Sequence, residues 1–210
     1  MDSKKRRKIY EILSLENPAP ESELKFLTPY ELLVAVMLSA QATDKGVNQA
    51  TAKLFPVANT PAEIVALGVE GLEAYVRTIN LYHNKARHII DASKILLERY
   101  GGVVPEDFDA LVTLPGVGPK TANVVLNVAF GKETIPVDTH VFRVSNRTGL
   151  APGKTPDAVM KKLLKVTPAE FKRNAHHWLL LHGRYCCKAT KPACGACPIR
   201  ELCEFKEKVL

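Results

Sequence analysis

The sequence predicts an all-α protein with roughly ten helices. Its 210 residues contain repeated Thr-Pro pairs typical of helix starts, and the apolar residues after them recur at helical spacing. We find no convincing alternation of apolar and polar residues and no Asn-Gly or Asp-Gly turn, the patterns that indicate strands and hairpins. The apolar content of 46% is enough for a core in one large domain or two small ones.

Four Thr-Pro pairs predict the clearest helix starts. A threonine hydroxyl caps free amide groups, and proline suits the first helical position because its missing N–H would have no partner there. In three of the four pairs a glutamate follows at the capping-box position. The pairs are Thr28-Pro29, Thr60-Pro61, Thr155-Pro156 and Thr167-Pro168, and the glutamates are Glu31, Glu63 and Glu170.

Apolar residues at helical spacing extend the predicted helices. One such set begins at Leu32 and continues through Val36 to Ala40. Another contains Ile89 and Leu96, and Gly101 predicts its end. The segment 124–128 is more uniformly apolar, which predicts a buried helix.

Residues 114–122 read Leu-Pro-Gly-Val-Gly-Pro-Lys-Thr-Ala, a glycine hairpin that opens onto a helix. Gly116 and Gly118 allow the backbone to bend sharply and to approach a ligand closely. The first amide groups of the helix are unpaired donors at a positive dipole end, so this corner is expected to bind an anion such as phosphate. Lys120 adds an amine at the same place.

A nucleotide-binding P-loop does not fit this stretch, because that motif needs a glycine directly before the lysine and a strand leading in. Here Pro119 precedes Lys120, and residues 106–112 look helical. A plain turn between two helices would explain the glycines but not the lysine. The pattern instead indicates a helix-hairpin-helix motif, which grips a nucleic-acid backbone without reading its sequence.

The formal net charge is +7, and the positive excess lies in the C-terminal third. Residues 133–210 hold 14 Lys and Arg against 7 Asp and Glu. A polyanion is the expected partner because cationic side chains displace its counterions, although a solvated basic surface would have the same composition. No segment predicts a membrane span or a signal peptide, so we expect an intracellular protein.

Four of the five cysteines form a local cluster, Cys187-x6-Cys194-x2-Cys197-x5-Cys203. Such spacing wraps a short chain around one metal centre, with each thiolate on a different turn. Disulfides are disfavoured in a chain without an export signal. Zinc and an iron-sulfur cluster both accept four thiolates, so the spacing leaves both open. Because adjacent side chains rarely reach one site together, we interpret Cys186 as a free thiol.

Asp138 follows the apolar segment 135–137 and is either the cap of the next helix or a carboxylate delivered beside Lys120. Together, LPGVGPKTA, VDTHVFRV and the cysteine pattern resemble the endonuclease III family, the helix-hairpin-helix DNA glycosylases and abasic-site lyases of base-excision repair. The resemblance covers essentially the entire chain, including LSAQATD at 38–44 and Leu81-Tyr82.

The resemblance implies two helical lobes with DNA bound between them. Residues 22–132 would form a helical bundle that carries the helix-hairpin-helix, and residues 1–21 with 133–210 would form an iron-sulfur cluster domain. One [4Fe-4S] cluster is implied on Cys187, Cys194, Cys197 and Cys203. The implied partner is double-stranded DNA with damaged pyrimidines or abasic sites, and a cytoplasmic monomer is expected, associated with the nucleoid in a prokaryote.

The resemblance also assigns the site residues. Lys120 would be the nucleophile and Asp138 its acidic partner, Gln41 would fill the gap left by the flipped base, and Leu81 would wedge into the opposite strand. Gly116, Gly118 and Lys191 are expected to contact the DNA backbone. The chain departs from the usual family pattern at Pro119, where a basic residue is common, at Asn80, where a glycine is common, and at Thr190 and Ala193 in the cysteine loop.

The expected chemistry follows from an amine nucleophile. A neutral Lys120 can attack the sugar C1′, expel the base and form a Schiff base that permits strand cleavage by β-elimination. The helix start disfavours charge on this lysine whereas Asp138 favours it, so activation must come mostly from desolvation. Asp138 is expected to stabilise the positive charge that develops on the sugar.

Two rival interpretations account for less of the sequence. A mismatch glycosylase that removes adenine or thymine and then stops usually lacks a lysine at the nucleophile position, and the adenine-specific relatives carry an additional C-terminal domain. A non-catalytic DNA-binding protein with a zinc-stabilised tail would explain the hairpin, the charge and the cysteines. It would leave the pairing of Lys120 with Asp138 unexplained.

Overall fold

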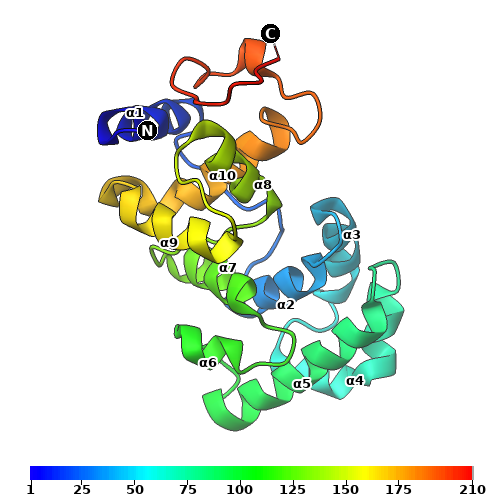
Figure 1. The fold of residues 1–210 in the computed structure, drawn as a ribbon. Helices are drawn as coiled ribbons and strands as arrows, with labels where there is room; N and C mark the ends of the chain where they lie inside the picture. The colour runs from blue at the N-terminus through cyan, green and yellow to red at the C-terminus, as the bar shows by residue number, and fades with distance from the viewer. Residues whose placement is uncertain (210) are drawn as a thin grey trace. The chain divides into compact units, whose positions relative to one another are not determined.

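The structure is a computed structural model that describes residues 1–209. Within that range it contains ten α-helices, two short 3₁₀ turns and no strand, as predicted (Figure 1). The chain divides into two compact units, Ser22–Gly131, and Met1–Glu21 together with Lys132–Leu210. The second boundary lies one residue before the expected one, because Gly131 already ends the last helix of the first unit. No helix in the described part is both long and apolar enough to cross a membrane.

The unit Ser22–Gly131 is built around α2. Nine consecutive residues of α2, from Tyr30 to Leu38, are buried, because α3, α5 and α7 all pack against it. A helix buried on every side is expected to be mostly apolar, and Glu31 is the charged residue within this buried stretch. Its helices are α2 (Pro29–Ser39), α3 (Asp44–Leu54), α4 (Pro61–Val76), α5 (Tyr82–Tyr100), α6 (Phe108–Val112) and α7 (Pro119–Phe130).

The helix starts of this unit follow the predicted capping with one change. Thr60 and Glu63 form a full capping box at the start of α4. Thr28 caps α2 by accepting from the Glu31 N–H, but the Glu31 carboxylate accepts from the Leu27 N–H instead of closing a box with Thr28. Glu31 is 2% exposed and also accepts from Asn59, so a long-range partner has drawn its side chain away from the local motif.

The second unit packs the N-terminal helix against helices from the other end of the chain. Its helices are α1 (Ser3–Glu16), α8 (Thr139–Thr148), α9 (Pro156–Val166) and α10 (Lys172–Tyr185), with 3₁₀ turns at Ala169–Phe171 and Cys194–Ala196. Tyr10 of α1 and Trp178 of α10 share one core. At Gly183 of α10 an added Cβ would lie 2.9 Å from the His140 Cβ of α8, so this glycine lets the two helices approach closely.

The predicted helix start at Thr167-Pro168 is wrong. Thr167 instead ends α9, and a 3₁₀ turn separates it from α10, which begins at Lys172. The Thr167 hydroxyl is hydrogen-bonded to the buried Tyr10 hydroxyl at 2.9 Å, so it is not used as a cap. Glu170 pairs with Arg7 of α1 rather than forming a capping box. A partner more than 150 residues away has overridden the local signal at both positions.

The hairpin between α6 and α7 has the predicted helix on each side. Leu114 and Val117 are buried and anchor it, while Gly116 and Gly118 are exposed. Gly116 has a left-handed φ of 76°, and an added Cβ would lie 2.9 Å from the His88 Cβ. Gly118 has an extended φ of −86° and open space around it. Only Gly116 therefore needs glycine in order to fold.

We predict that Gly116→Ala and Gly118→Ala will differ in stability. Gly116→Ala should lower the free energy of unfolding by about 1–3 kcal/mol, because it forces alanine into left-handed backbone against His88. Gly118→Ala should cost less than about 0.5 kcal/mol, since its backbone is one that any residue adopts. Urea denaturation of both variants measures the difference, and equal losses would contradict the hairpin conformation described here.

Candidate functional site

The start of α7 brings a lysine and a helix terminus together. Gly118 caps the helix without a side-chain hydrogen bond, and Pro119 occupies the first helical position. Lys120 follows in the first turn, and its side chain is exposed. The positive end of the helix dipole and the first-turn amide groups favour an anion here. The open space at Gly118 lets such an anion approach the backbone.

Asp138 lies at the start of α8 in the second unit, after the buried segment 135–137. Its Oδ1 accepts a hydrogen bond from the Val141 N–H at 2.7 Å, so the expected helix cap is confirmed. Capping and chemistry are compatible, because a carboxylate has two oxygens and several acceptor positions. The cap also fixes the direction in which the carboxylate points. Lys120 and Asp138 belong to different compact units.

Gln41 and Leu81 share an uncommon backbone conformation. Both are non-glycine residues with positive φ, 56° for Gln41 and 60° for Leu81. Both are exposed, and 59% of the leucine surface faces solvent. Gln41 follows the end of α2, and Leu81 immediately precedes α5. Strained backbone at exposed residues is frequently found at functional sites, because folding alone does not favour it. Leu81 also exposes a large apolar side chain, which folding does not favour either.

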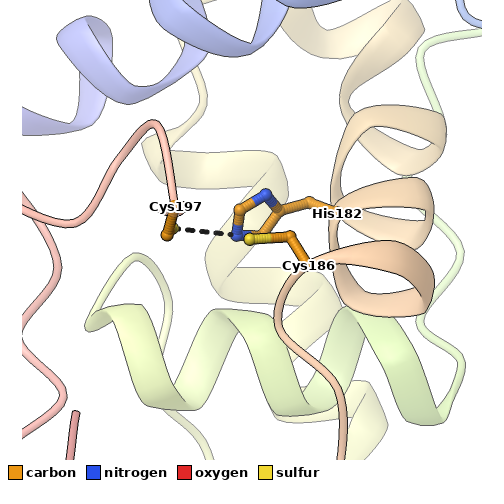
Figure 2. A group of neighbouring side chains, drawn as sticks. All are labelled: His182, Cys186 and Cys197. Carbon is orange, nitrogen blue, oxygen red and sulfur yellow. Dashed lines mark hydrogen bonds between the residues drawn. The ribbon is translucent and has the colours of Figure 1, made fainter. Parts of the chain in front are cut away.

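The cysteine cluster surrounds one cavity in the segment after α10. All four predicted ligands line one pocket. Cys186 and His182 also line the pocket, next to Cys187. The interpretation of Cys186 as a free thiol stays a prediction. Figure 2 shows Cys186 at the end of α10 beside His182, with Cys197 opposite, and the His182 Nε2 lies 3.7 Å from the Cys197 sulfur. Burial lowers the pKa of His182 to about 4, so its ring is neutral at pH 7.

A single zinc ion requires its ligand atoms to lie close together. A tetrahedral zinc with Zn–S bonds of about 2.3 Å would hold its sulfurs about 3.8 Å apart. Within residues 1–209, one group of three or more His, Cys, Asp and Glu ligand atoms lies within 4.8 Å of one another, and it comprises His182, Cys186 and Cys197. Of the four predicted cysteines this group contains Cys197 alone, and all four line the pocket. Four thiolates suit either zinc or an iron-sulfur cluster, so the donor atoms by themselves leave both metals open.

Two arginines of α8, which sequence analysis did not single out, hold the cysteine loop. Arg143 donates to the carbonyl oxygens of Cys187 at 2.9 Å and Gly183 at 2.7 Å. Arg147 donates to the carbonyl oxygens of Lys188 at 2.6 Å and Ala189 at 2.9 Å. Their i, i+4 spacing places them on one face of α8, which is the signal that could have found them.

Lys191 lies at the tip of the same loop and is exposed, with a left-handed φ of 49°. The loop closes behind it through a hydrogen bond from the Ala193 N–H to the Cys186 carbonyl at 3.0 Å. Lys191 therefore lies on a tight turn, and Arg143 and Arg147 bind the backbone of the same loop. Because the loop backbone is already fixed, less conformational entropy is lost when Lys191 binds an anion.

Two family models match this chain. A model described as HhH-GPD superfamily base excision DNA repair protein matches residues 34–169, a range that contains the hairpin, Lys120 and Asp138. A second model, the iron-sulfur binding domain of endonuclease III, matches residues 187–203. These limits coincide with the first and last of the four predicted ligands, Cys187 and Cys203.

Curated relatives match this chain over its full length. The chain is 62% identical to endonuclease III of Escherichia coli (strain K12) and 59% identical to endonuclease III of Haemophilus influenzae, covering 100% of this chain and 99% of each relative. A solved structure titled as a trapped endonuclease III-DNA covalent intermediate is 44% identical, with a TM-score of 0.91, covering 97% of this chain and 96% of that one. A thermostable thymine-DNA glycosylase, 24% identical with a TM-score of 0.87, has the same fold.

The high identity, the full coverage and the match of both family models all indicate the same family. Together they identify an enzyme, a DNA glycosylase of base-excision repair that carries a [4Fe-4S] cluster. The cysteine pocket described above fits that cofactor in donor chemistry, because all four predicted thiolate ligands line it. The chain therefore belongs to the endonuclease III family within the HhH-GPD superfamily of base excision DNA repair proteins.

Proposed function

We propose that this glycosylase is bifunctional: it removes oxidised pyrimidines from duplex DNA and then cleaves the strand at the abasic site. The observation that carries the proposal is the exposed amine of Lys120 in the first turn of α7, directly after the glycine hairpin. An anion-binding corner places the amine where a DNA phosphate holds the neighbouring sugar. The trapped covalent DNA intermediate reported for a 44% identical protein supports it.

Phosphate binding at the hairpin positions the DNA. The α7 dipole and first-turn amides attract a phosphate, and the open space at Gly118 permits close contact. These contacts are to backbone and carry no sequence information, as a repair enzyme that must act at any sequence requires. Lys191 on the cysteine loop adds a further phosphate contact.

Lys120 performs both chemical steps. Its neutral amine forms a bond to C1′ of the damaged nucleotide as the bond from C1′ to the base breaks, and the base leaves with the electron pair. Loss of a proton from nitrogen and opening of the sugar ring give a Schiff base, which acidifies the C2′ proton. Removal of that proton expels the 3′ phosphate by β-elimination. Because Lys120 is exposed in the protein alone, bound DNA supplies the desolvation that its neutral form requires.

Asp138 is the acidic partner in this scheme. Its carboxylate is held by the Val141 N–H and stabilises the positive charge that develops on the sugar as the base departs. A preorganised carboxylate does not have to reorient during the reaction, so its stabilising effect is largest in the transition state.

Gln41 and Leu81 open the duplex. Swinging a base out of the stack costs roughly a few kcal/mol, least for weakened pairs. Leu81 presents exposed apolar surface that can insert into the opposite strand, and Gln41 can hydrogen-bond the base left without a partner. Damaged pairs are then selected partly because they open at lower cost.

Cys187, Cys194, Cys197 and Cys203 are the proposed cluster ligands. When bound, the cluster would supply iron atoms that the four cysteine thiolates coordinate, and these bonds would make the loop rigid. The chain's own contribution is to mount that loop on α8, through Arg143 and Arg147, and to present Lys191 outward. The cluster is assigned a structural role here.

The first prediction concerns covalent trapping. Borohydride added during reaction with an abasic-site duplex should trap a protein-DNA adduct, because it reduces the Schiff base. Lys120→Arg should abolish trapping while retaining DNA binding, because a guanidinium keeps the positive charge but is not a nucleophile. An adduct of equal yield in Lys120→Arg would refute the lysine assignment. Base release by the wild-type protein without any adduct or strand cleavage would favour a monofunctional glycosylase.

The second prediction compares two adjacent cysteines. Cys187→Ala should lose the cluster, whereas Cys186→Ala should retain about four irons per chain, because only Cys187 is assigned as a ligand. Iron and sulfide content and visible absorbance measure the outcome. Loss of the cluster in Cys186→Ala together with its retention in Cys187→Ala would reverse the assignment. The double variant would then show whether the cluster can form without either thiol.

The third prediction concerns salt dependence. Affinity for duplex DNA should fall linearly on a log-log salt plot, and Lys191→Ala should reduce the slope by about 0.9, the value for one phosphate contact. Lys4→Ala, an exposed lysine on α1, serves as a control for a general loss of charge. An equal change in slope for both variants would remove Lys191 from the DNA contacts.

A further inference from the structure

Two loops that carry the proposed duplex-opening residues are joined to each other by hydrogen bonds. The Asn80 Nδ2 donates to the Gln41 carbonyl oxygen at 3.0 Å. Lys85, in the first turn of α5, donates from Nζ to the carbonyl oxygens of Leu38 at 2.7 Å and Ala40 at 2.5 Å. Two side chains from the segment around Leu81 therefore hold three carbonyls of the segment that leads into Gln41.

The two carbonyls that Lys85 binds, those of Leu38 and Ala40, are at the end of α2, where the last C=O groups have no partner in the helix. Lys85 is 8% exposed, so its ammonium group is desolvated, and burial lowers its pKa. A cation at the negative end of the α2 dipole is favoured there. The buried ion is thus matched to acceptors that would otherwise be unsatisfied.

The backbone of the two residues shows the need for such bonds. Left-handed backbone is unfavourable for a non-glycine residue, and a bulky leucine is poorly suited to it. Leu81 nevertheless adopts it directly after Asn80, and Gln41 adopts it at the carbonyl that Asn80 binds. Surrounding structure must hold both conformations, because local preference does not.

We propose that Asn80 and Lys85 form a brace that fixes Gln41 and Leu81 relative to each other, so that both side chains enter the duplex as one preorganised unit. The inference rests on the duplex-opening roles given to Gln41 and Leu81 above. Asn80 is a positioning residue: it acts through Gln41 and Leu81. A braced pair loses less conformational freedom on insertion than two independent loops.

The brace makes a prediction about substrate choice. It helps only where a stacked base must be displaced, and an abasic site needs less opening. Asn80→Ala should therefore slow single-turnover processing of an oxidised pyrimidine in duplex DNA about fivefold more than it slows cleavage at a preformed abasic site, the effect of one hydrogen bond of about 1 kcal/mol. Asn80→Asp should behave alike, because a carboxylate cannot donate to the Gln41 carbonyl.

A double-variant cycle tests the coupling. If Asn80 acts by placing Gln41, its effect on the damaged duplex should shrink when the Gln41 side chain is already absent, so Asn80→Ala in a Gln41→Ala background should be clearly less than additive. Asn84→Ala, an exposed asparagine in the first turn of α5, is the control and should be additive with Gln41→Ala. Urea denaturation separates either effect from a loss of stability. A fluorescent base analogue in the duplex reports the extent of opening directly.

The outcomes distinguish the brace from the function on which it rests. Equal slowing of both substrates by Asn80→Ala, no slowing, or full additivity with Gln41→Ala would overturn the brace while Gln41→Ala alone still impairs the damaged duplex. If Gln41→Ala and Leu81→Ala leave the damaged duplex unaffected, the duplex-opening roles fail, and the brace fails with them. If Lys85→Met lowers the free energy of unfolding but slows both substrates equally, Lys85 is only a structural cap of α2 and not part of the brace.

Discussion

Hydrogen bonds from cationic side chains to backbone carbonyls hold the loops on which the proposed function depends. Lys85 holds the end of α2 ahead of Gln41, and Arg143 and Arg147 hold the cysteine loop that carries Lys191. A carbonyl at a loop or helix end needs a donor, and a charged donor gives a stronger bond than a neutral one. The exposed residues Gln41 and Lys191 can then keep left-handed backbone, because these donors fix the backbone next to them.

This use of cations changes how the basic composition should be understood. The second unit owes its excess of positive charge partly to Arg143 and Arg147, which are directed at carbonyl groups inside it. They add to the electrostatic field around the protein while their N–H groups donate to these carbonyls. Lys191 is an exposed cation on the same loop. Net charge therefore indicates a polyanionic partner, while the number of phosphate contacts depends on which cations remain exposed.

Local signals in the sequence predicted much of the fold, and long-range partners explain the exceptions. The capping box at Thr60 and the left-handed Gly101 that ends α5 are confirmed, since each depends on a few neighbouring residues. Thr167 was wrongly interpreted as a helix start because Tyr10, from the opposite end of the chain, binds its hydroxyl. Cys186 reaches the cysteine cavity because the end of α10 turns there. Asn80 was noticed only as a departure from a glycine, and its link to Gln41 required the folded chain.

The central claim is that Lys120, and no other amine, forms the bond to the sugar. Peptide mapping by mass spectrometry of the borohydride-reduced complex tests it most directly, because reduction makes the linkage permanent and digestion locates it. The account predicts the mass of the reduced sugar fragment on the peptide that contains Lys120, at that residue. A reduced sugar attached to another lysine or to the N-terminal amine, with Lys120 unmodified, would contradict it.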